Sequence, residues 1–290
     1  MTLRPSAREE GLVLVNVLLM VVLASGLVAA MLVAQNASLQ RSQRLRDAAS
    51  ADAALAGAEL SAIGALRRDA VRQPESDDLN QSWARIGDRD RAIAGGTFSL
   101  VVADAQAKFN VNTLARGDSA SRATLASIVD LLRLPPDVAT RIAALLKAVG
   151  PISSLAQLGL AGVQPAQIAK LAAFCTVLPP AAATINVNTA DERLLGVLVG
   201  DQVAGRLLAN RRARQGFLAR PDFIFARTLV PSSAGFASDF YWVRGSVSIG
   251  GTRRGQTTLL RRDVRAKRPE VVPISRWIGG GAPLEAPPSP

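Results

Sequence analysis

LVLVNVLLMVVLASGLVAAMLVA, residues 12–34, is apolar throughout except at Asn16 and Ser25. With a helical rise of about 1.5 Å per residue, the stretch spans about 35 Å, enough to cross a hydrocarbon core of about 30 Å. The apolar core of a secretory signal usually has about 7–15 residues, so this stretch is longer than a plain signal peptide requires. It therefore predicts a membrane anchor, with signal-peptidase cleavage after Ala30 as the alternative.

The helix is expected to continue well beyond the anchor. No proline occurs between Pro5 and Pro74, and residues 35–72 are rich in Ala, Leu, Arg and Gln, which favour helices. Apolar residues recur at helical spacing on one face: Leu55, Ile63, Leu66 and Ala70. We therefore expect one helix over about 12–72, apolar all round in its first half and amphipathic in its second.

Composition excludes several kinds of active site. The chain has no histidine and one cysteine, Cys175. Serine–histidine and cysteine–histidine nucleophile pairs, histidine-ligated metals and internal disulfides are therefore impossible. No other nucleophile–base motif is present, so the sequence makes no case for an enzyme and implies no cofactor or metal.

The net charge of +11 raises the question of an anionic partner. The basic run 253–268 could bind phosphates, but it also suits the solvated face of an edge strand, where charge blocks aggregation. We favour the edge strand. The acidic pair Asp77 and Asp78 lies in a polar, turn-rich stretch, and we expect both residues in a solvated loop.

Three later stretches predict an antiparallel meander that packs on the amphipathic half of the helix. They are residues 97–104, 240–249 and 256–264, which alternate apolar and polar side chains or are rich in β-formers. Residues 73–96 indicate a loop. From Pro269 on, prolines and glycines predict a disordered tail.

A helical block, about residues 119–230, lies between the first and second of these strands. Pattern and breakers predict helices at 120–133, 137–149, 165–175 and 191–213. Cys175 falls on an apolar face of the third and is expected to be buried.

The sequence FNVNT at residues 109–113 recurs as INVNT at residues 185–189. Each copy leads into a helical stretch. Because Asn and Thr beside an extended segment can cap the following helix, we interpret the repeat as structural rather than catalytic.

Four stretches, in this order, carry a family resemblance. They are the leader and apolar helix around Gly11-Leu12, DAQAKFNVNTL at 104–114, ATINVNTADERLL at 183–195 with LLANRRARQGFLARPDFI at 207–224, and SDFYWVRGSVSI at 238–249. Together they resemble the minor pseudopilin K family of type II secretion systems. The family motif comprises Phe109, Asn110, Asn112, Asn186, Asn188, Asp239, Tyr241 and Trp242.

The resemblance implies an α+β fold with a pilin-like long N-terminal helix packed on a small antiparallel sheet. A large all-α domain, SAM-like or helix-hairpin-helix-like, is inserted between the strands. The implied segments are a leader (1–11), a transmembrane part (12–34), an amphipathic helix with the first part of the pilin-like domain (35–112), the inserted domain (113–235), the last strands (236–268) and the tail (269–290).

The resemblance also implies a function. Members of the family lie at the tip of the periplasmic pseudopilus and help initiate its assembly, for export of folded proteins across the outer membrane. Prepilin peptidase would cleave after Gly11, and Leu12 would be N-methylated. The implied partners are minor pseudopilins I and J and the major pseudopilin. The chain would cross the inner membrane once, with a cytoplasmic N-terminus before cleavage and a periplasmic globular part.

Asn16 would stand at the fifth mature position, where pilins usually carry glutamate. In a filament, that glutamate would neutralise the N-terminal amine of a neighbouring subunit within the membrane, where an unpaired charge is costly. A subunit that starts the filament has no neighbour ahead of it. Family members characteristically lack the glutamate, so Asn16 fits a tip subunit.

Two departures from the family concern a calcium site and the state of Cys175. The chain is short between Lys147 and Leu155, where longer homologues carry an acidic, calcium-binding stretch, so we predict no such site. Lys108 stands where some relatives have a cysteine, so Cys175 is expected to be a free thiol.

The main alternative is a membrane-anchored DNA-binding protein. Residues 185–217 also resemble the helix-hairpin-helix of competence receptors, and Arg211, Arg212 and Arg214 could contact phosphates. However, residues 198–201 (LVGD) lack the GxG hairpin that presents backbone N–H groups to phosphate. We therefore expect no nucleic acid partner.

Overall fold

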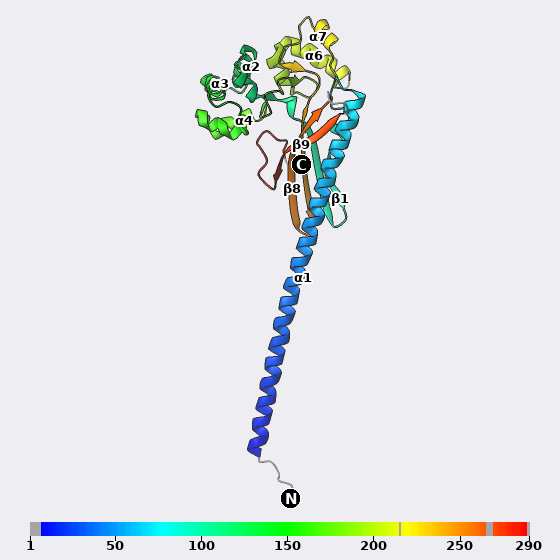
Figure 1. The fold of residues 1–290 in the computed structure, drawn as a ribbon, viewed down its shortest axis with the longest axis vertical. Coiled ribbons are helices and arrows are strands. Elements are labelled where there is room, and N and C mark those ends of the chain that lie inside the picture. The colour runs from blue at the N-terminus through cyan, green and yellow to red at the C-terminus, as the bar shows by residue number, and fades with distance from the viewer. Residues whose placement is uncertain (1–6, 215, 265–268, 289–290) are drawn as a thin grey trace. The chain divides into compact units, whose positions relative to one another are not determined.

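The computed structural model describes residues 7–214, 216–264 and 269–288, with side chains from residue 14 onward. Internal contacts divide the chain into one unit that ends at Ser50 and another that begins at Ala51. A single helix, α1 (Ala7–Arg72), belongs partly to each (Figure 1). The prediction of one helix over about 12–72 is confirmed.

In the first unit, α1 presents an apolar surface to the outside. Its large side chains are exposed from Leu14, at 71%, to Val33, at 68%. The most apolar 18-residue window has a mean hydropathy of 2.8, and none of it is buried inside the protein. By length and composition this segment can cross a membrane, consistent with a single-pass anchor.

In the second unit, the described residues form a five-stranded antiparallel sheet in the order β1-β2-β7-β8-β9. The strands are β1 (Asp88–Ile93), β2 (Gly96–Asp104), β7 (Phe240–Ile249), β8 (Thr252–Asp263) and β9 (Glu270–Ile278). The three predicted strands are confirmed. The prediction of a loop at 73–96 was wrong in part, because it contains β1 and the 3-10 helix η1 (Ser82–Arg85).

The predicted disordered tail is also corrected, because β9 pairs with β8 along most of its length. Composition misled here, since Pro273 sits at the register shift between Leu259 and Leu260, on an edge strand. Proline is tolerated at edges and bulges, where its missing N–H breaks no ladder. Arg276 further ties β9 to α1, with its Nη2 2.6 Å from Oε1 of Glu59.

The second half of α1 packs on one face of the sheet. Its predicted apolar face is buried, with Leu66 fully enclosed. The shared core combines small helix residues with large strand residues: Ala58, Ala62, Ile63, Ala65, Leu66, Trp83, Leu100, Tyr241, Val243, Leu260 and Val271. Alanines allow the helix to approach the sheet closely. The other face of the sheet carries Phe240, Trp242 and Leu259, which pack in a separate core.

Between β2 and β7 the chain makes the inserted helical region. Its helical elements are η2 (Ala105–Ala107), η3 (Val111–Arg116), α2 (Ser119–Leu131), α3 (Asp137–Val149), η4 (Leu155–Ala161), α4 (Pro165–Leu171), α5 (Glu192–Val199), α6 (Asp201–Ala213) and α7 (Arg220–Phe225). Its short strands pair in parallel as β3 (Phe109–Asn110) with β4 (Cys175–Thr176) and β5 (Ile185–Asn186) with β6 (Ala234–Gly235).

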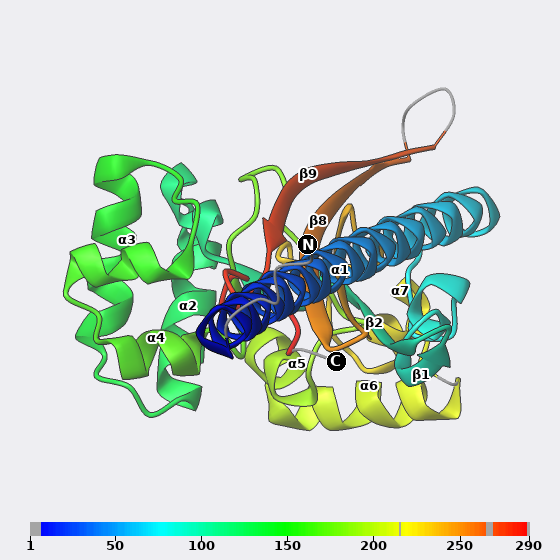
Figure 2. The same ribbon diagram turned by 90° about the horizontal axis from the view of Figure 1, so that it is seen from below.

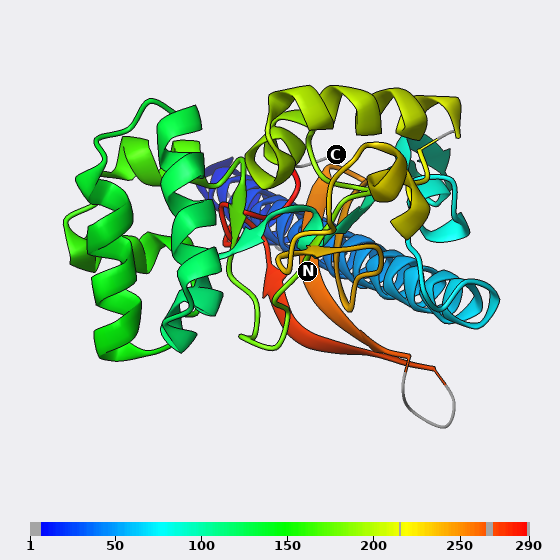
Figure 3. The ribbon, with the colours of Figure 1, turned by 90° about the horizontal axis from the view of Figure 1, so that it is seen from above.

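The insert has one core around α2, α3 and α4 and another around α5, α6 and α7. Figures 2 and 3 show α2, α3 and α4 gathered apart from α6. Helix α5 joins the two cores, with Leu194 in the first and Leu195 in the second. Two predicted helices are corrected. The third ends at Leu171, and Cys175 instead pairs with Phe109 in a strand. The fourth divides at Gly200, whose φ of +81° suits glycine and separates α5 from α6.

Candidate functional site

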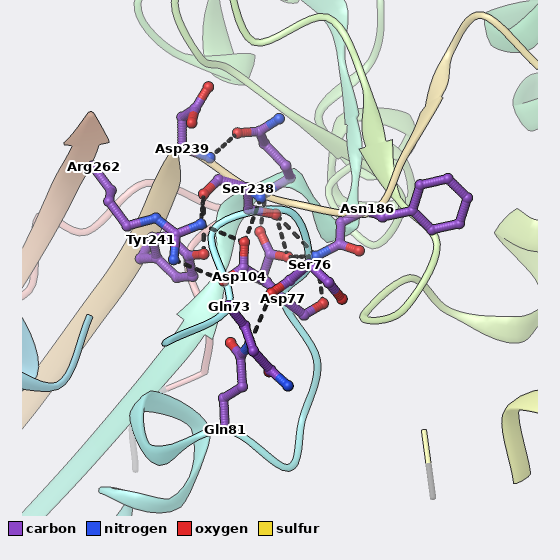
Figure 4. A network of polar contacts seen from close by, with 12 residues as sticks. Gln73, Ser76, Asp77, Gln81, Asp104, Asn186, Ser238, Asp239, Tyr241 and Arg262 are labelled. Carbon is purple, nitrogen blue, oxygen red and sulfur yellow. Dashed lines mark hydrogen bonds and ion pairs between the residues drawn. The ribbon is translucent and has the colours of Figure 1, made fainter. Parts of the chain in front are cut away.

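The chain leaves the sheet at Asp104 and returns to it at Phe240, shortly after Ser238, and these two ends lie together because β2 and β7 are paired there. We call the polar cluster at this point the junction; it comprises Asp77, Asp104, Asn186, Ser238 and Arg262 (Figure 4). These residues come from the loop after α1, the end of β2, the insert, the return to β7 and from β8. The junction thus connects the loop after α1, the sheet and the insert.

A buried ion pair lies at the centre of the junction. Asp77 and Arg262 have no exposed side-chain surface, and both carboxylate oxygens accept from the guanidinium. Arg262 Nη2 also donates to the carbonyl of Ser238 at 2.6 Å, and the Ser238 N–H donates to Asp77 Oδ2 at 2.7 Å. The pair therefore holds the strand by which the insert returns to the sheet.

Asp104 is the second buried carboxylate of the junction. Its Oδ2 accepts from Ser238 Oγ and Thr189 Oγ1, each at 2.6 Å, and from Asn186 Nδ2 at 2.9 Å. Its Oδ1 accepts from the Gln106 N–H at 2.8 Å. Burial nevertheless raises the pKa of Asp104 to about 6, although the hydrogen bonds from Ser238 and Thr189 oppose the rise.

Asn186 connects the second copy of the repeat, residues 185–189, to this cluster. Its Nδ2 donates to Asp104 and also to Ser238 Oγ and to the carbonyl of Asp77, both at 3.1 Å. Its Oδ1 accepts from the Asn188 N–H at 3.0 Å. Asn188 in turn accepts from the Leu218 N–H at 2.7 Å, which fixes the chain after α6.

The first copy repeats this geometry away from the junction. Asn110 Oδ1 accepts from the N–H groups of Asn112 and Leu178, at 3.2 and 3.0 Å. Asn112 exchanges two hydrogen bonds with Ile152, each at 2.9 Å. The capping interpretation is confirmed for Asn110, which caps η3. It was wrong for the second copy, because Asp191 caps α5.

The other motif residues are distributed over the fold. Tyr241 Oη donates to the Ser238 carbonyl at 3.0 Å, and its ring meets Trp83 edge-on at 5.2 Å. Phe109 is in the insert core, and Trp242 lies on the opposite face of the sheet from Tyr241. The backbone N–H of Asp239, whose residue is exposed, donates to Gln106 Oε1 at 2.6 Å.

The N-terminal candidates lie in the first unit. Asn16 is exposed on the apolar part of α1. Gly11 and Leu12 fall within α1, but their side chains lie outside the described part of the structure. The cleavage and methylation assignments therefore stay predictions.

Sequence reasoning missed the central ion pair. Asp77 was expected in a solvated loop and Arg262 on the solvated face of an edge strand. The edge-strand prediction was wrong, because β8 lies between β7 and β9 in the sheet. Asp77 and Arg262 are both buried, and each neutralises the other. A signal did exist: Thr258, Leu260 and Arg262 alternate along β8, which places Arg262 on the face that packs on α1.

The arginines considered for phosphate binding have partners within the protein. Arg211 Nη1 donates to the carbonyls of Val187 and Ala190 at 3.1 and 2.9 Å. Arg212 pairs with Glu192 at 3.0 Å, and Arg214 pairs with a buried aspartate, Asp222, at 3.1 Å. Through these contacts Arg211 and Arg212 connect α6 with the residues before it, and Arg214 connects the end of α6 with α7.

The polar groups of the junction bond mainly to one another, although Arg262 Nε is buried without a hydrogen-bond partner among the described residues. Among the residues that the structure describes, no cluster of three acidic or sulfur side chains could hold a metal ion. Cys175 is a free thiol and fully buried, and burial raises its pKa to about 12. The arrangement is suited to holding two parts of a domain in fixed geometry.

No protein-family model and no curated protein matches the chain. Among solved structures, the chain is similar to one in the crystal structure of the GspK-GspI-GspJ complex from the enterotoxigenic Escherichia coli type 2 secretion system. The TM-score is 0.65 over 82% of this chain and 99% of that one, at 20% identity. The chain has a pseudopilin-like fold. At this identity the likeness establishes the fold alone.

Proposed function

We propose that the chain is a minor pseudopilin of the K type, which acts at the tip of a type II secretion pseudopilus and helps initiate its assembly. The observation that carries the proposal is the combination of an exposed apolar helix with a sheet that holds a helical insert. In support, the similar chain from the GspK-GspI-GspJ complex aligns over 99% of its own length with 82% of this chain.

The apolar half of α1 supports a subunit that moves from membrane to filament. Its side chains from Leu14 to Val33 are exposed in the isolated chain, so they require lipid or neighbouring helices around them. Either environment satisfies the same surface. We infer that the helix is stored in the inner membrane and is then withdrawn into a filament core.

Asn16 supports a place at the start of the filament. In the proposed mature protein it stands at the fifth position and carries no charge to neutralise the amine of a preceding subunit. A subunit with nothing ahead of it does not need that charge. The bulky insert also suits a cap better than a repeating shaft subunit, whose heads must pack side by side. We propose the counterparts of GspI and GspJ as its direct partners.

The test is the N-terminal sequence and mass of the protein purified from membranes, with and without prepilin peptidase. The proposal predicts a peptidase-dependent start at N-methylated Leu12. A Gly11→Val chain should stay uncleaved, whereas Gly26→Ala, at a site with open space around it, should be processed normally.

A start at Met1 in every sample, or one near Met31, would contradict the proposal. The mature chain should also co-purify with minor pseudopilins I and J. If it instead retained duplex DNA, and an Arg212→Ala change weakened that binding, the competence-receptor alternative would replace the proposal.

A further inference from the structure

A short segment after β9 lies against the face of the sheet opposite α1. We call residues 283–288 (PLEAPP) the strap; it follows three consecutive glycines at 279–281 and is the last described segment, red in Figure 1. Glu285 and Ala286 are only 2% and 7% exposed, whereas Leu284 is 56% exposed. A segment without regular secondary structure thus places two consecutive side chains in the interior.

Cationic side chains hold the strap by its backbone carbonyls. Lys108 Nζ donates to the Glu285 carbonyl at 3.0 Å, and Arg244 Nη1 donates to the Pro287 carbonyl at 2.6 Å. Lys108 also donates to the Ala172 carbonyl after α4 at 2.7 Å. Proline offers a carbonyl but no N–H, so side-chain donors are the appropriate partners for a proline-rich segment.

The surface beneath the strap is aromatic. Ala286 shares a core with Trp242 and Leu259, and the Trp242 and Trp277 rings lie 5.6 Å apart. Two pockets of about 340 and about 260 Å³, both partly open to solvent, border the strap, and each is lined by Trp242 and Glu285. The groove therefore offers room beside the strap.

The polar fit of the strap is incomplete as well. Trp242 Nε1 and Glu285 Oε2 are buried, and neither has a hydrogen-bond partner among the described residues. Burial raises the pKa of Glu285 and lowers that of Lys108, because each is charged in a poorly hydrated place. A segment without the glutamate and with an acceptor for Trp242 would fit the groove better.

We propose that the groove formed by Trp242, Trp277, Lys108 and Arg244 is a docking site for an extended, proline-containing segment of a partner protein. The strap occupies this groove within the same chain, and the partner segment would displace it. Aromatic grooves commonly recognise proline-rich segments, whose preformed extended shape costs little entropy to bind. The Gly279 N–H donates to the Gly255 carbonyl at 2.8 Å, so Gly280 and Gly281 after it would be the tether that lets the strap leave.

The test uses a fluorescent peptide of residues 281–290 and the full chain. Ala286→Arg places a long charged side chain at a buried position and should release the strap. The variant is expected to bind the peptide at least tenfold more tightly than the unchanged chain, whose groove is filled. Leu284→Arg, at an exposed strap position, is the matched control and should bind no better than the unchanged chain.

The donors are tested in the Ala286→Arg background. Lys108→Met or Arg244→Met should weaken peptide binding at least fivefold, while Arg253→Met, an exposed arginine of β8, should not. A peptide with Pro283, Pro287 and Pro288 changed to alanine should also bind less tightly. If circular dichroism shows that Ala286→Arg does not fold, a chain shortened to residue 281 takes its place. Absence of peptide binding by the folded variant, or equal binding by the unchanged chain, would overturn the proposal.

Discussion

Residues 110–113 and 186–189 share the sequence Asn-Val-Asn-Thr, and in each the first asparagine accepts from the N–H of the second. Each second asparagine then accepts from a backbone N–H 40 or 30 residues further along the chain. The surroundings differ. The first copy bonds to neutral backbone groups, whereas the second also bonds to the charged Asp104. The same motif thus closes one helical unit and, in its second copy, joins another to the sheet.

The largest expected effect comes from breaking the ion pair beside the second copy. Arg262→Met leaves Asp77 buried without its partner, which should lower the free energy of unfolding by about 3–5 kcal/mol. Urea denaturation of the second unit measures it. The neighbouring Arg261 is exposed, so Arg261→Met is the control and should change stability by less than about 0.5 kcal/mol. Equal effects of the two changes would show that the junction does not depend on the pair.

The pH dependence of stability distinguishes the second copy, which bonds to Asp104, from the first copy, which bonds to neutral backbone groups. The folded pKa of Asp104 is about 6 against an ordinary 3.8, so the folded state holds this proton more tightly than the unfolded state. The contribution of Asp104 to the free energy of unfolding is therefore greatest below pH 4. It falls by about 3 kcal/mol as the pH rises to 6. Asp104→Asn should remove that loss from the profile.

Asp118 provides a control of opposite sign. It caps α2, and hydrogen bonds from Ser121 lower its pKa despite slight burial. Its stabilising contribution is present above its unfolded pKa and is lost as the pH falls. Asp118→Asn should thus change the pH dependence of stability at acidic pH in the direction opposite to Asp104→Asn. If Asp104→Asn left the profile unchanged, Asp104 would titrate normally in the folded protein.

Substituting the asparagines tests the comparison itself. Asn186→Ala and Asn110→Ala each leave buried groups unsatisfied and should destabilise by about 2–3 kcal/mol. In double-mutant cycles, Asn186→Ala should couple to Arg262→Met by more than about 0.5 kcal/mol, whereas Asn110→Ala should be additive with it. Additivity in both cycles would mean that the second copy is not part of the junction.

The smallest effect is a change in thiol accessibility. Cys175 lies in β4, paired with the first copy, and its buried thiol has a raised pKa, so a thiol reagent should react only after local opening. Asn110→Ala should speed labelling by about tenfold, which corresponds to about 1.4 kcal/mol of local destabilisation. Asn186→Ala should leave the rate nearly unchanged. The reverse order would contradict the assignment of the two copies to separate parts of the insert.

The parts predicted from the sequence are those set by local pattern. The uninterrupted α1, the strands around residues 97–104 and 240–249, and the insert between them all follow from periodicity and from the positions of proline. The errors at β9, Asp77 and Arg262 have another origin. Pro273 is tolerated only because β9 is an edge strand with a bulge, and the two charges are buried only because they meet across 185 residues of chain. The alternation along β8 indicates the face on which Arg262 lies, but nothing in the local sequence identifies a partner at this separation.

The position of the protein in its assembly is the central claim, and counting copies along the filament tests it most directly. Pseudopili are isolated from cells that carry an epitope on an exposed loop of the insert, and the label is located by electron microscopy. The account predicts label at one end only, with about one copy per filament. In an Asn16→Glu chain, label along the shaft would show that Asn16 helps to confine the protein to the tip. Many copies spaced along the shaft with the native Asn16, or filaments that never carry the label, would contradict the account.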